Sequence, residues 1–225
     1  LGLAGRRVDA PDAGQAAAVR APDVIRGGDA GDVQRLVISP HTDDGELGCG
    51  GSITRFMEEG DSVSYVALSS CEKSVPPEYP CDILREEVRK ATRVLGIAEP
   101  ILYEFEVREF PRLRQEILDT LIGLRNTIQP DIVFTPSSFD THQDHKTTRE
   151  ETLRAFKQCT ILGYEQPWNN ITFNTLAFIP LEEHHIRRKI EALGCDRSQR
   201  HRAYLSEEFI RGLALVRGAP IEEKD

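Results

Sequence analysis

The sequence predicts an α/β protein, a Rossmann-like three-layer sandwich with a mostly parallel central sheet. Short apolar runs rich in β-branched residues alternate along the chain with longer stretches in which apolar residues recur every three or four positions. The first pattern is typical of buried strands and the second of amphipathic helices. This alternation favours parallel strands joined by right-handed helical crossovers, with helices on both faces of the sheet.

The first part of the chain contains three predicted strand–helix units. In the second unit, Leu84, Val88, Ala91 and Leu95 fall on one helical face, and Gly96 ends the helix. The predicted elements are a strand at 34–40, a helix at 47–59, a strand at 62–70, a helix at 82–95, a strand at 101–105, and a helix that carries Leu113, Ile117, Leu121 and Leu124 and ends before Pro130.

The remaining chain continues the alternation and forms one domain. Residues 1–33, rich in Ala, Gly, Asp and Arg without periodicity, predict a flexible extension, which leaves 34–225 as a single domain. A chain of 225 residues, 39% of them hydrophobic, can bury one sizeable core. The further predicted elements are strands at 131–135, 161–165 and 176–179 and helices at 147–157, 182–193 and 205–216.

Composition limits the partners and the compartment. A net charge of −9 disfavours nucleic acid as a partner, and the apolar runs are far shorter than a membrane span of roughly 20 residues. The first five residues lack the charged start and long core of a signal peptide. Five widely spaced cysteines without a C-x-x-C pair predict free thiols. We therefore expect a cytoplasmic protein, and these features are compatible with a homo-oligomer.

Polar side chains gather where the first predicted strand ends. The apolar run Leu36–Ile38 leads into Ser39–Glu46, with the sequence SPHTDDGE, and then into small residues and a helix. Open α/β sheets bind ligands at the C-terminal ends of their strands. His41 and Asp44 can each donate to one divalent metal, and Asp43 between them can then reach a metal-bound water. Taken alone, this pattern is more often loop polarity or a helix cap.

A second polar loop repeats this layout after the strand at 131–135. It contains His142 and His145 and precedes a predicted helix. If the two strands are parallel members of one sheet, both loops lie on the same edge. His41, Asp44 and one of the two later histidines can then close around an ion and leave a position open for water, as catalytic zinc sites require.

Both motifs resemble those of the LmbE-like or PIG-L N-acetylglucosaminyl deacetylases, which run His-x-Asp-Asp-x-Glu-x-Gly-x-Gly-Gly and His-x-Asp-His. The resemblance covers roughly residues 35–218. Thr42 stands where the family usually has Pro, and the family's strand-like tail is not evident in residues 219–225. The matching residues, in the family's order, are His41, Asp43, Asp44, Glu46, Gly48, Gly50 and Gly51, then His142, Asp144 and His145.

The resemblance implies a Zn²⁺-dependent enzyme that removes the N-acetyl group from a small-molecule amino sugar or glycoconjugate. His41, Asp44 and His145 would hold the ion, which would lower the pKa of its bound water from about 16 towards about 7. Asp43 would accept the proton of that water, and His142 would stabilise the oxyanion.

Three further residues receive roles from the same resemblance. Asp144 would hydrogen-bond the ring of His142 and so fix its tautomer and charge, which places it among the catalytic residues. Glu46 would support the start of the helix. Arg85 resembles a family position that contacts the sugar, although a solvated arginine explains it equally well. The glycines of the first motif are expected to permit tight packing of the helix on the sheet.

Alternatives to a zinc deacetylase stay open. Two histidines and a carboxylate also form the facial triad of non-haem iron oxygenases, so Fe²⁺ could occupy the site. A non-catalytic glycan-binding module is a third possibility, but Asp43 and His142 argue against it because binding alone needs neither.

His184 and His185 lie in a charged run that predicts a solvated helix face. Trp168 is a core or rim aromatic residue, or stacks on a sugar ring.

Overall fold

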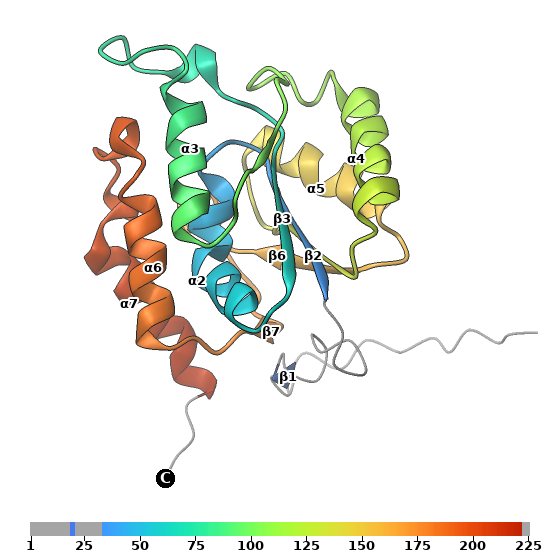
Figure 1. Ribbon diagram of the computed structural model, residues 1–225. Helices are drawn as coiled ribbons and strands as arrows, with labels where there is room; N and C mark the ends of the chain where they lie inside the picture. The colour runs from blue at the N-terminus through green and yellow to red at the C-terminus, as the bar shows by residue number, and fades with distance from the viewer. Residues whose placement is uncertain (1–18, 21–32, 222–225) are drawn as a thin grey trace, which may run out of the picture.

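A five-stranded parallel sheet forms the centre of the computed structural model, which describes residues 19–20 and 33–221. Every neighbouring pair of its strands runs parallel (Figure 1). The α/β sandwich predicted from the sequence is therefore confirmed. In spatial order the strands are β4 (Ile101–Leu102), β3 (Ser62–Ala67), β2 (Gln34–Ser39), β5 (Ile132–Pro136) and β6 (Thr160–Tyr164).

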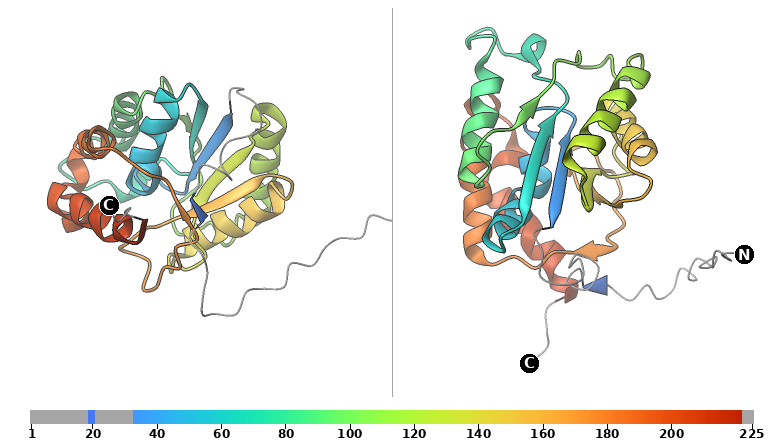
Figure 2. Two further views of the ribbon diagram at one scale, coloured as in Figure 1. Left: turned by 90° about the horizontal axis from the view of Figure 1, so that it is seen from below. Right: turned by 45° about the vertical axis from the view of Figure 1, so that its right-hand side comes forward.

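Helices cover both faces of the sheet (Figures 1 and 2). One layer contains α2 (Asp44–Glu58), α3 (Ile83–Val94), α6 (Glu183–Leu193) and α7 (Glu207–Gly218). The other contains α4 (Arg114–Ile128) and α5 (Gln143–Ala155). No helix in the described residues is both long enough and apolar enough to cross a membrane.

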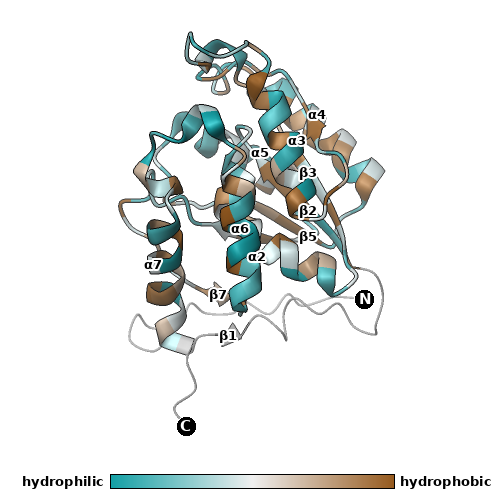
Figure 3. Ribbon diagram, turned by 60° about the vertical axis from the view of Figure 1, so that its left-hand side comes forward, coloured by the Kyte–Doolittle hydropathy of each residue, from teal (hydrophilic) through white to brown (hydrophobic). Residues whose placement is uncertain are grey.

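Strand β2 lies at the centre of the core. Val37 packs in the cluster on the α2 and α3 side, whereas Leu36 and Ile38 pack on the α4 and α5 side, and all three are fully buried. Burial on both faces explains why the strand is a continuous apolar run rather than an alternating one. Figure 3 shows hydrophobic residues on the central strands and both hydrophobic and hydrophilic residues on the surrounding helices.

Two helices begin earlier than the sequence pattern predicts. Helix α2 begins at Asp44 rather than at residue 47, and α5 begins at Gln143 rather than at 147. Asp43 and His142 are their N-cap residues. Acidic side chains are stabilised in a first helical turn by the backbone dipoles, so a polar motif can be helical. As a result Asp44 and His145 project from the first turns of helices, not from loops.

Three predicted strands are shorter than expected. The strand predicted at 62–70 ends at Ala67. The strand predicted at 101–105 narrows to β4, although Phe105 still donates its N–H to Leu68 O at 3.1 Å. The strand predicted at 176–179 becomes β7 (Ala177–Phe178), which pairs with β1 (Val19–Arg20) outside the main sheet. Apart from β1 and Val33, the predicted extension at 1–33 lies outside the described residues.

The order of the strands places the two polar motifs side by side. After β2 the chain moves outward through β3 to β4 and then returns to the opposite side of β2 with β5. The C-terminal ends of β2 and β5 are neighbours, with Val37 paired to Phe134. Such a switch point between parallel strands opens the crevice in which α/β sheets bind ligands.

Two tyrosine rings occupy the space beside glycines of α2. The Tyr65 hydroxyl donates to Thr42 O at 3.0 Å, and its ring lies where a Cβ on Gly45 would come within 2.4 Å. A Cβ on Gly48 would come equally close to the ring of Tyr164. These glycines therefore allow the first turns of α2 to pack tightly against the sheet.

The next two glycines of the motif serve a different contact. A Cβ on Gly50 would approach Lys189, and one on Gly51 would approach Leu181, both on the α6 side of the helix. The expectation that the whole glycine pattern packs the helix on the sheet is therefore wrong for this pair, which permits close packing of α2 with α6.

We predict that Gly45→Ala lowers the free energy of unfolding by about 1–3 kcal/mol, because the added methyl group overpacks the Tyr65 ring. Gly123→Ala is the matched control, since Gly123 lies in α4 and a Cβ added there would meet no atom within 4 Å. It should raise the free energy by about 0.5–1 kcal/mol. Urea denaturation followed by circular dichroism measures both, and equal stability of Gly45→Ala and wild type would contradict the packing argument.

Candidate functional site

Three side-chain atoms form a compact triangle at the crevice between β2 and β5. Asp44 Oδ2 lies 3.1 Å from His41 Nδ1 and 3.1 Å from His145 Nε2, and the two nitrogens are 3.3 Å apart. Ligands on a tetrahedral zinc ion, with bonds of about 2.0–2.1 Å, lie roughly 3.3 Å from one another. The triangle therefore has the size and the donor chemistry of a divalent metal site.

Each histidine of the triangle has a second carboxylate behind it. His41 Nε2 lies 3.0 Å from Asp144 Oδ2, and His145 Nδ1 lies 2.7 Å from Asp140 Oδ2. Both of these aspartates are fully or almost fully buried. A carboxylate on the far nitrogen of an imidazole fixes the ring and turns the other nitrogen towards a metal.

The carboxylates control the protonation of the triangle. Burial disfavours the charged form of His41, but hydrogen bonds with Asp144 and Asp44 outweigh it and raise its pKa to about 9. For His145, burial is outweighed by Asp44 and Asp140, and the pKa rises to about 10. Burial also opposes ionisation of Asp44, yet the adjacent imidazoles hold the pKa of its carboxyl well below the usual range.

Asp43 is adjacent to Asp44 of the triangle, and within residues 33–221 its carboxylate makes no hydrogen bond to another side chain. It is the N-cap residue of α2, but its side chain makes no capping hydrogen bond. Burial, and then the charge of Asp44, raise its pKa above the usual carboxyl value. A carboxylate with a raised pKa that makes no capping hydrogen bond is suited to accept and return a proton.

His142 lies at the edge of the triangle. Its Nδ1 accepts the backbone N–H of Asp144 at 3.2 Å, which leaves the ring proton of the neutral form on Nε2. Burial, and then the neighbouring His145 and His41, lower its pKa. One ring nitrogen from each of His41, His142 and His145 lies within 4.8 Å of the other two. His142 can therefore act, as a neutral hydrogen-bond donor, on a group bound at the triangle.

The contacts of Asp144 differ from those expected. From the sequence, its carboxylate is expected on the ring of His142, whereas in the structure Oδ2 contacts His41 Nε2 and accepts the backbone N–H of Arg108 at 2.7 Å. Only the backbone of Asp144 contacts His142. The expected carboxylate–ring pair is therefore wrong. The reason is that His142 is the N-cap residue of α5, so its ring lies over the first amides of the helix.

Sequence reasoning did not identify two residues that hold the site. Asp140 orients His145, and Gln166, 2% exposed, donates to Asp44 O at 2.7 Å. A second carboxylate five residues before His145 was the available signal for Asp140. Nothing near Gln166 in the sequence marked it.

Glu46 is buried, and its carboxyl group contacts the hydroxyl of Tyr65. Burial raises the pKa of Glu46 to about 8, so its neutral form supports the start of α2.

Arg85 lies at the same edge of the sheet but is already paired. Its guanidinium contacts Glu72 at 2.6 Å, Glu104 at 2.6 Å and Ser70 Oγ at 3.2 Å. Ser70 belongs to the loop after β3, whose Ser69 donates its N–H to Pro40 O at 3.0 Å. The structure thus brings Arg85 near the site without placing it among the groups of the triangle.

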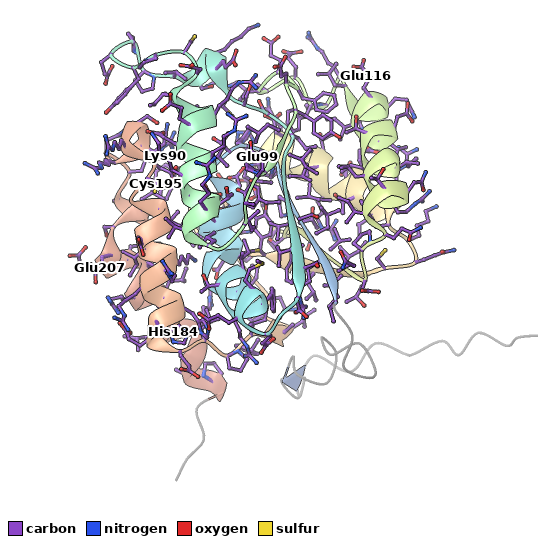
Figure 4. All side chains as sticks on the ribbon, viewed as in Figure 1. Lys90, Glu99, Glu116, His184, Cys195 and Glu207 are labelled. Carbon is purple, nitrogen blue, oxygen red and sulfur yellow. The ribbon has the colours of Figure 1, made fainter. Side chains whose placement is uncertain are left out.

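A second group of metal-ligating side chains lies elsewhere. Glu58, His184 and His185 converge between α2 and the start of α6, with His185 Nε2 3.0 Å from Glu58 Oε2. His184 lies on the lower end of α6 (Figure 4) and contacts Glu58 at the C-terminal end of α2, whereas Asp44 lies at the other end of that helix. His185 Nδ1 accepts the N–H of Glu182 at 2.8 Å, so the ring proton sits on Nε2 and blocks metal binding there. We assign this group to helix capping.

The chain also contains a mostly apolar cavity of about 1050 Å³ outside the triangle. It lies along β6 and the segment that includes β7, and its walls include Leu162, Phe178, Ile186 and Leu215. None of the triangle residues lines it. Ionisable groups that converge on one point carry the chemistry of hydrolysis better than volume does, so we place the functional site at the triangle.

Comparisons with known proteins identify relatives of the chain. The PIG-L family model, GlcNAc-PI de-N-acetylase, matches residues 36–156. The chain is 29% identical over 164 residues to the uncharacterized deacetylase YaiS of Escherichia coli (strain K12), an alignment that covers 70% of this chain and 87% of YaiS. Among solved structures, N,N'-diacetylchitobiose deacetylase from Pyrococcus horikoshii superposes with a TM-score of 0.68 at 23% identity, over 84% of this chain and 80% of that one.

The fold also occurs with another activity. GalB, the 4-carboxy-2-hydroxymuconate hydratase of Pseudomonas putida KT2440, has a TM-score of 0.60 at 23% identity, over 84% of this chain and 88% of its own. The fold alone therefore does not select the reaction. The family model, however, spans more than half of the chain and includes both polar motifs. The chain belongs to the PIG-L family.

Proposed function

We propose that this chain is a zinc-dependent hydrolase that removes the N-acetyl group from an amino sugar or glycoconjugate, releasing acetate and a free amine. The observation that carries the proposal is the triangle of His41, Asp44 and His145, 3.1–3.3 Å on its sides, next to the carboxylate of Asp43, which makes no capping hydrogen bond. Family membership and a deacetylase relative along most of the chain support the same reaction.

The donor set fits zinc. Two imidazole nitrogens and one carboxylate oxygen are ligands that zinc prefers, and three protein ligands leave a coordination position for water or substrate. When bound, the ion supplies Lewis acidity, lowering the pKa of water and polarising the amide carbonyl. Asp140 and Asp144 fix the ligand rings, which are the supports that such a site requires.

The residues around the triangle supply the remaining steps of amide hydrolysis. Asp43 takes a proton from the attacking water and later gives it to the nitrogen of the leaving amine, so that the proton is conserved. The Nε2–H of neutral His142 donates to the oxygen that becomes negative as water adds to the carbonyl carbon. This role needs the neutral ring, which is the form favoured by the lowered pKa of His142.

A hydratase is the second candidate, because GalB shares the fold and its reaction also consumes water. Hydration adds water to a double bond and leaves an N-acetyl group in place, so product analysis separates the two reactions. The comparisons favour neither the iron oxygenase nor the non-catalytic glycan-binding module. Oxygen consumption with a 2-oxo acid would identify the former, and glycan binding without turnover the latter.

The proposed function predicts that the purified protein with Zn²⁺ converts N-acetyl sugars to products that lack one acetyl group and carry a free amine. Mass spectrometry on a panel of N-acetylated mono- and disaccharides measures this conversion. Chelator treatment should abolish it and added Zn²⁺ should restore it. Deacetylation that persists in rigorously metal-free protein would exclude the mechanism, and water addition without loss of acetyl would favour the hydratase.

Asp43→Asn is the sharpest control for this experiment. The amide matches the carboxylate in size but cannot accept a proton near neutral pH, so turnover should fall about 100- to 10,000-fold while the metal content stays unchanged. His41→Ala, in contrast, should lose metal together with activity. Loss of metal from Asp43→Asn would mean that Asp43 is a ligand and that Asp44 has been assigned the wrong role.

Zinc binding to chelator-treated protein at pH 6 should release about two protons. The reason is that the pKa values of His41, about 9, and His145, about 10, keep both rings protonated at that pH, whereas a zinc ligand must be neutral. The apparent affinity of the protein for zinc should therefore rise with pH and level off only above about pH 10. Calorimetry in buffers of different ionisation enthalpy counts the protons, and a count near zero would contradict the proposed ligand pair.

Asp144→Asn should lower zinc affinity about 10- to 100-fold, because its carboxylate orients the ring of His41. His142→Gln should leave zinc affinity unchanged, because His142 lies outside the triangle. Competition with a chromophoric chelator measures both affinities. The opposite result, unchanged affinity in Asp144→Asn with reduced turnover, would restore the expectation that Asp144 acts through His142.

A further inference from the structure

The loop after β6 is fixed to both polar motifs. The side-chain amide of Gln166 donates to the backbone oxygen and the carboxylate of Asp44, at 2.7 and 3.3 Å. The backbone oxygen of Asn169 accepts the N–H and the hydroxyl of Thr141, at 3.2 and 2.9 Å. Thr141 directly precedes His142. The loop therefore holds its side chains in a defined position next to the triangle.

Trp168, in the middle of this loop, is 72% exposed. Its ring contacts that of Tyr204, with 5.4 Å between centroids and 38° between planes. Tyr204 belongs to the 3₁₀ turn Ala203–Leu205 that precedes α7. Two rings from distant parts of the chain thus form one aromatic platform, and an exposed tryptophan on a braced loop offers apolar area that a ligand can bury.

The guanidinium group of Arg202 lies beside this platform. Arg202 Nη1 donates to the Tyr204 hydroxyl at 2.8 Å, and its Nε donates to Gln199 Oε1 at 2.5 Å. Its Nη2 makes no hydrogen bond within residues 33–221. The positive charge of Arg202 opposes the rise in the pKa of Asp43, so the guanidinium is close enough to interact with that carboxylate. A planar donor with free N–H groups is suited to bind hydroxyl or acidic oxygens.

We propose that Trp168, Tyr204 and Arg202 form a subsite for the second ring of the substrate, either another sugar or a flat aglycone. The C–H face of a pyranose is apolar and packs on an aromatic ring, while its edge presents hydroxyls that the guanidinium can bind. Since the loop that carries Trp168 is fixed to Asp44 and Thr141, and Arg202 is close enough to Asp43 for their charges to interact, the platform can meet the part of the substrate beyond the reacting ring. The inference rests on the proposed deacetylase function and makes N-acetyl glycoconjugates of at least two rings its preferred substrates.

The unique tryptophan of the chain makes the subsite directly observable. Trp168 is the sole tryptophan among 225 residues, so protein tryptophan fluorescence reports on this position alone. Titrating the zinc-loaded enzyme with chitobiose, a two-ring amine that has no acetyl group to lose, should change the emission in a saturable way. Glucosamine, which has one ring, should leave the emission unchanged. An unchanged emission with both sugars would overturn the proposal.

Kinetics of two variants test whether the contact serves the larger substrate. Trp168→Ala should lower kcat/KM for N,N'-diacetylchitobiose about tenfold, mainly by raising KM, and should leave that for N-acetylglucosamine within about twofold. Trp168→Phe should recover most of the loss. Ile171→Ala is the matched control, because Ile171 is 89% exposed in the same connection between β6 and β7. It should behave as wild type towards both sugars.

These experiments distinguish failure of the subsite from failure of the proposed deacetylase function. Equal losses for the one-ring and two-ring substrates in Trp168→Ala would show a general structural role and overturn the subsite. A wild-type enzyme that deacetylates neither sugar would instead remove the proposed function. In that case the fluorescence titration alone decides whether the platform binds a second ring.

Discussion

The parallel pairing of β2 with β5 is the constraint on which the candidate site depends. His41 and Asp144 are 103 residues apart in the chain, yet their side chains meet at 3.0 Å because both strands end on the same edge of the sheet. Helices α2 and α5 then begin immediately beyond the strands and direct Asp44 and His145 into the same crevice. Without this pairing, neither motif contains enough donors to hold an ion.

Buried carboxylates then give the crevice its rigidity. Each imidazole of the triangle contacts two of them, His41 between Asp44 and Asp144, and His145 between Asp44 and Asp140. Removing one member of a buried ion pair leaves an uncompensated charge, which typically costs about 3–5 kcal/mol. The groups thus hold one another in place, and Tyr65 and Gln166 attach the set to β3 and to the loop after β6.

Patterns of local spacing predicted most of the fold and the identity of the motifs. Alternating strands and helices required parallel pairing, and parallel pairing placed His41 and His145 on one edge, as the structure confirms. The partner of Asp144 could not be predicted, because it depends on which ring a buried carboxylate meets across the sheet. Likewise, Gly45 is a motif residue in the sequence, but the reason for it is the Tyr65 ring, which arrives from another strand.

The half-buried carboxylate of Asp43 beside the ionised Asp44 also bears on how a product would leave. Hydrolysis of an N-acetyl group turns a neutral amide into an acetate anion and an amine. In the proposed reaction the amine would take up the proton from Asp43, which would restore the negative charge of that carboxylate as the acetate forms. Like charges repel in a partly buried crevice. In the proposed reaction, the restored charge on Asp43 would therefore weaken the attraction of a bound cation for the acetate and favour its replacement by water.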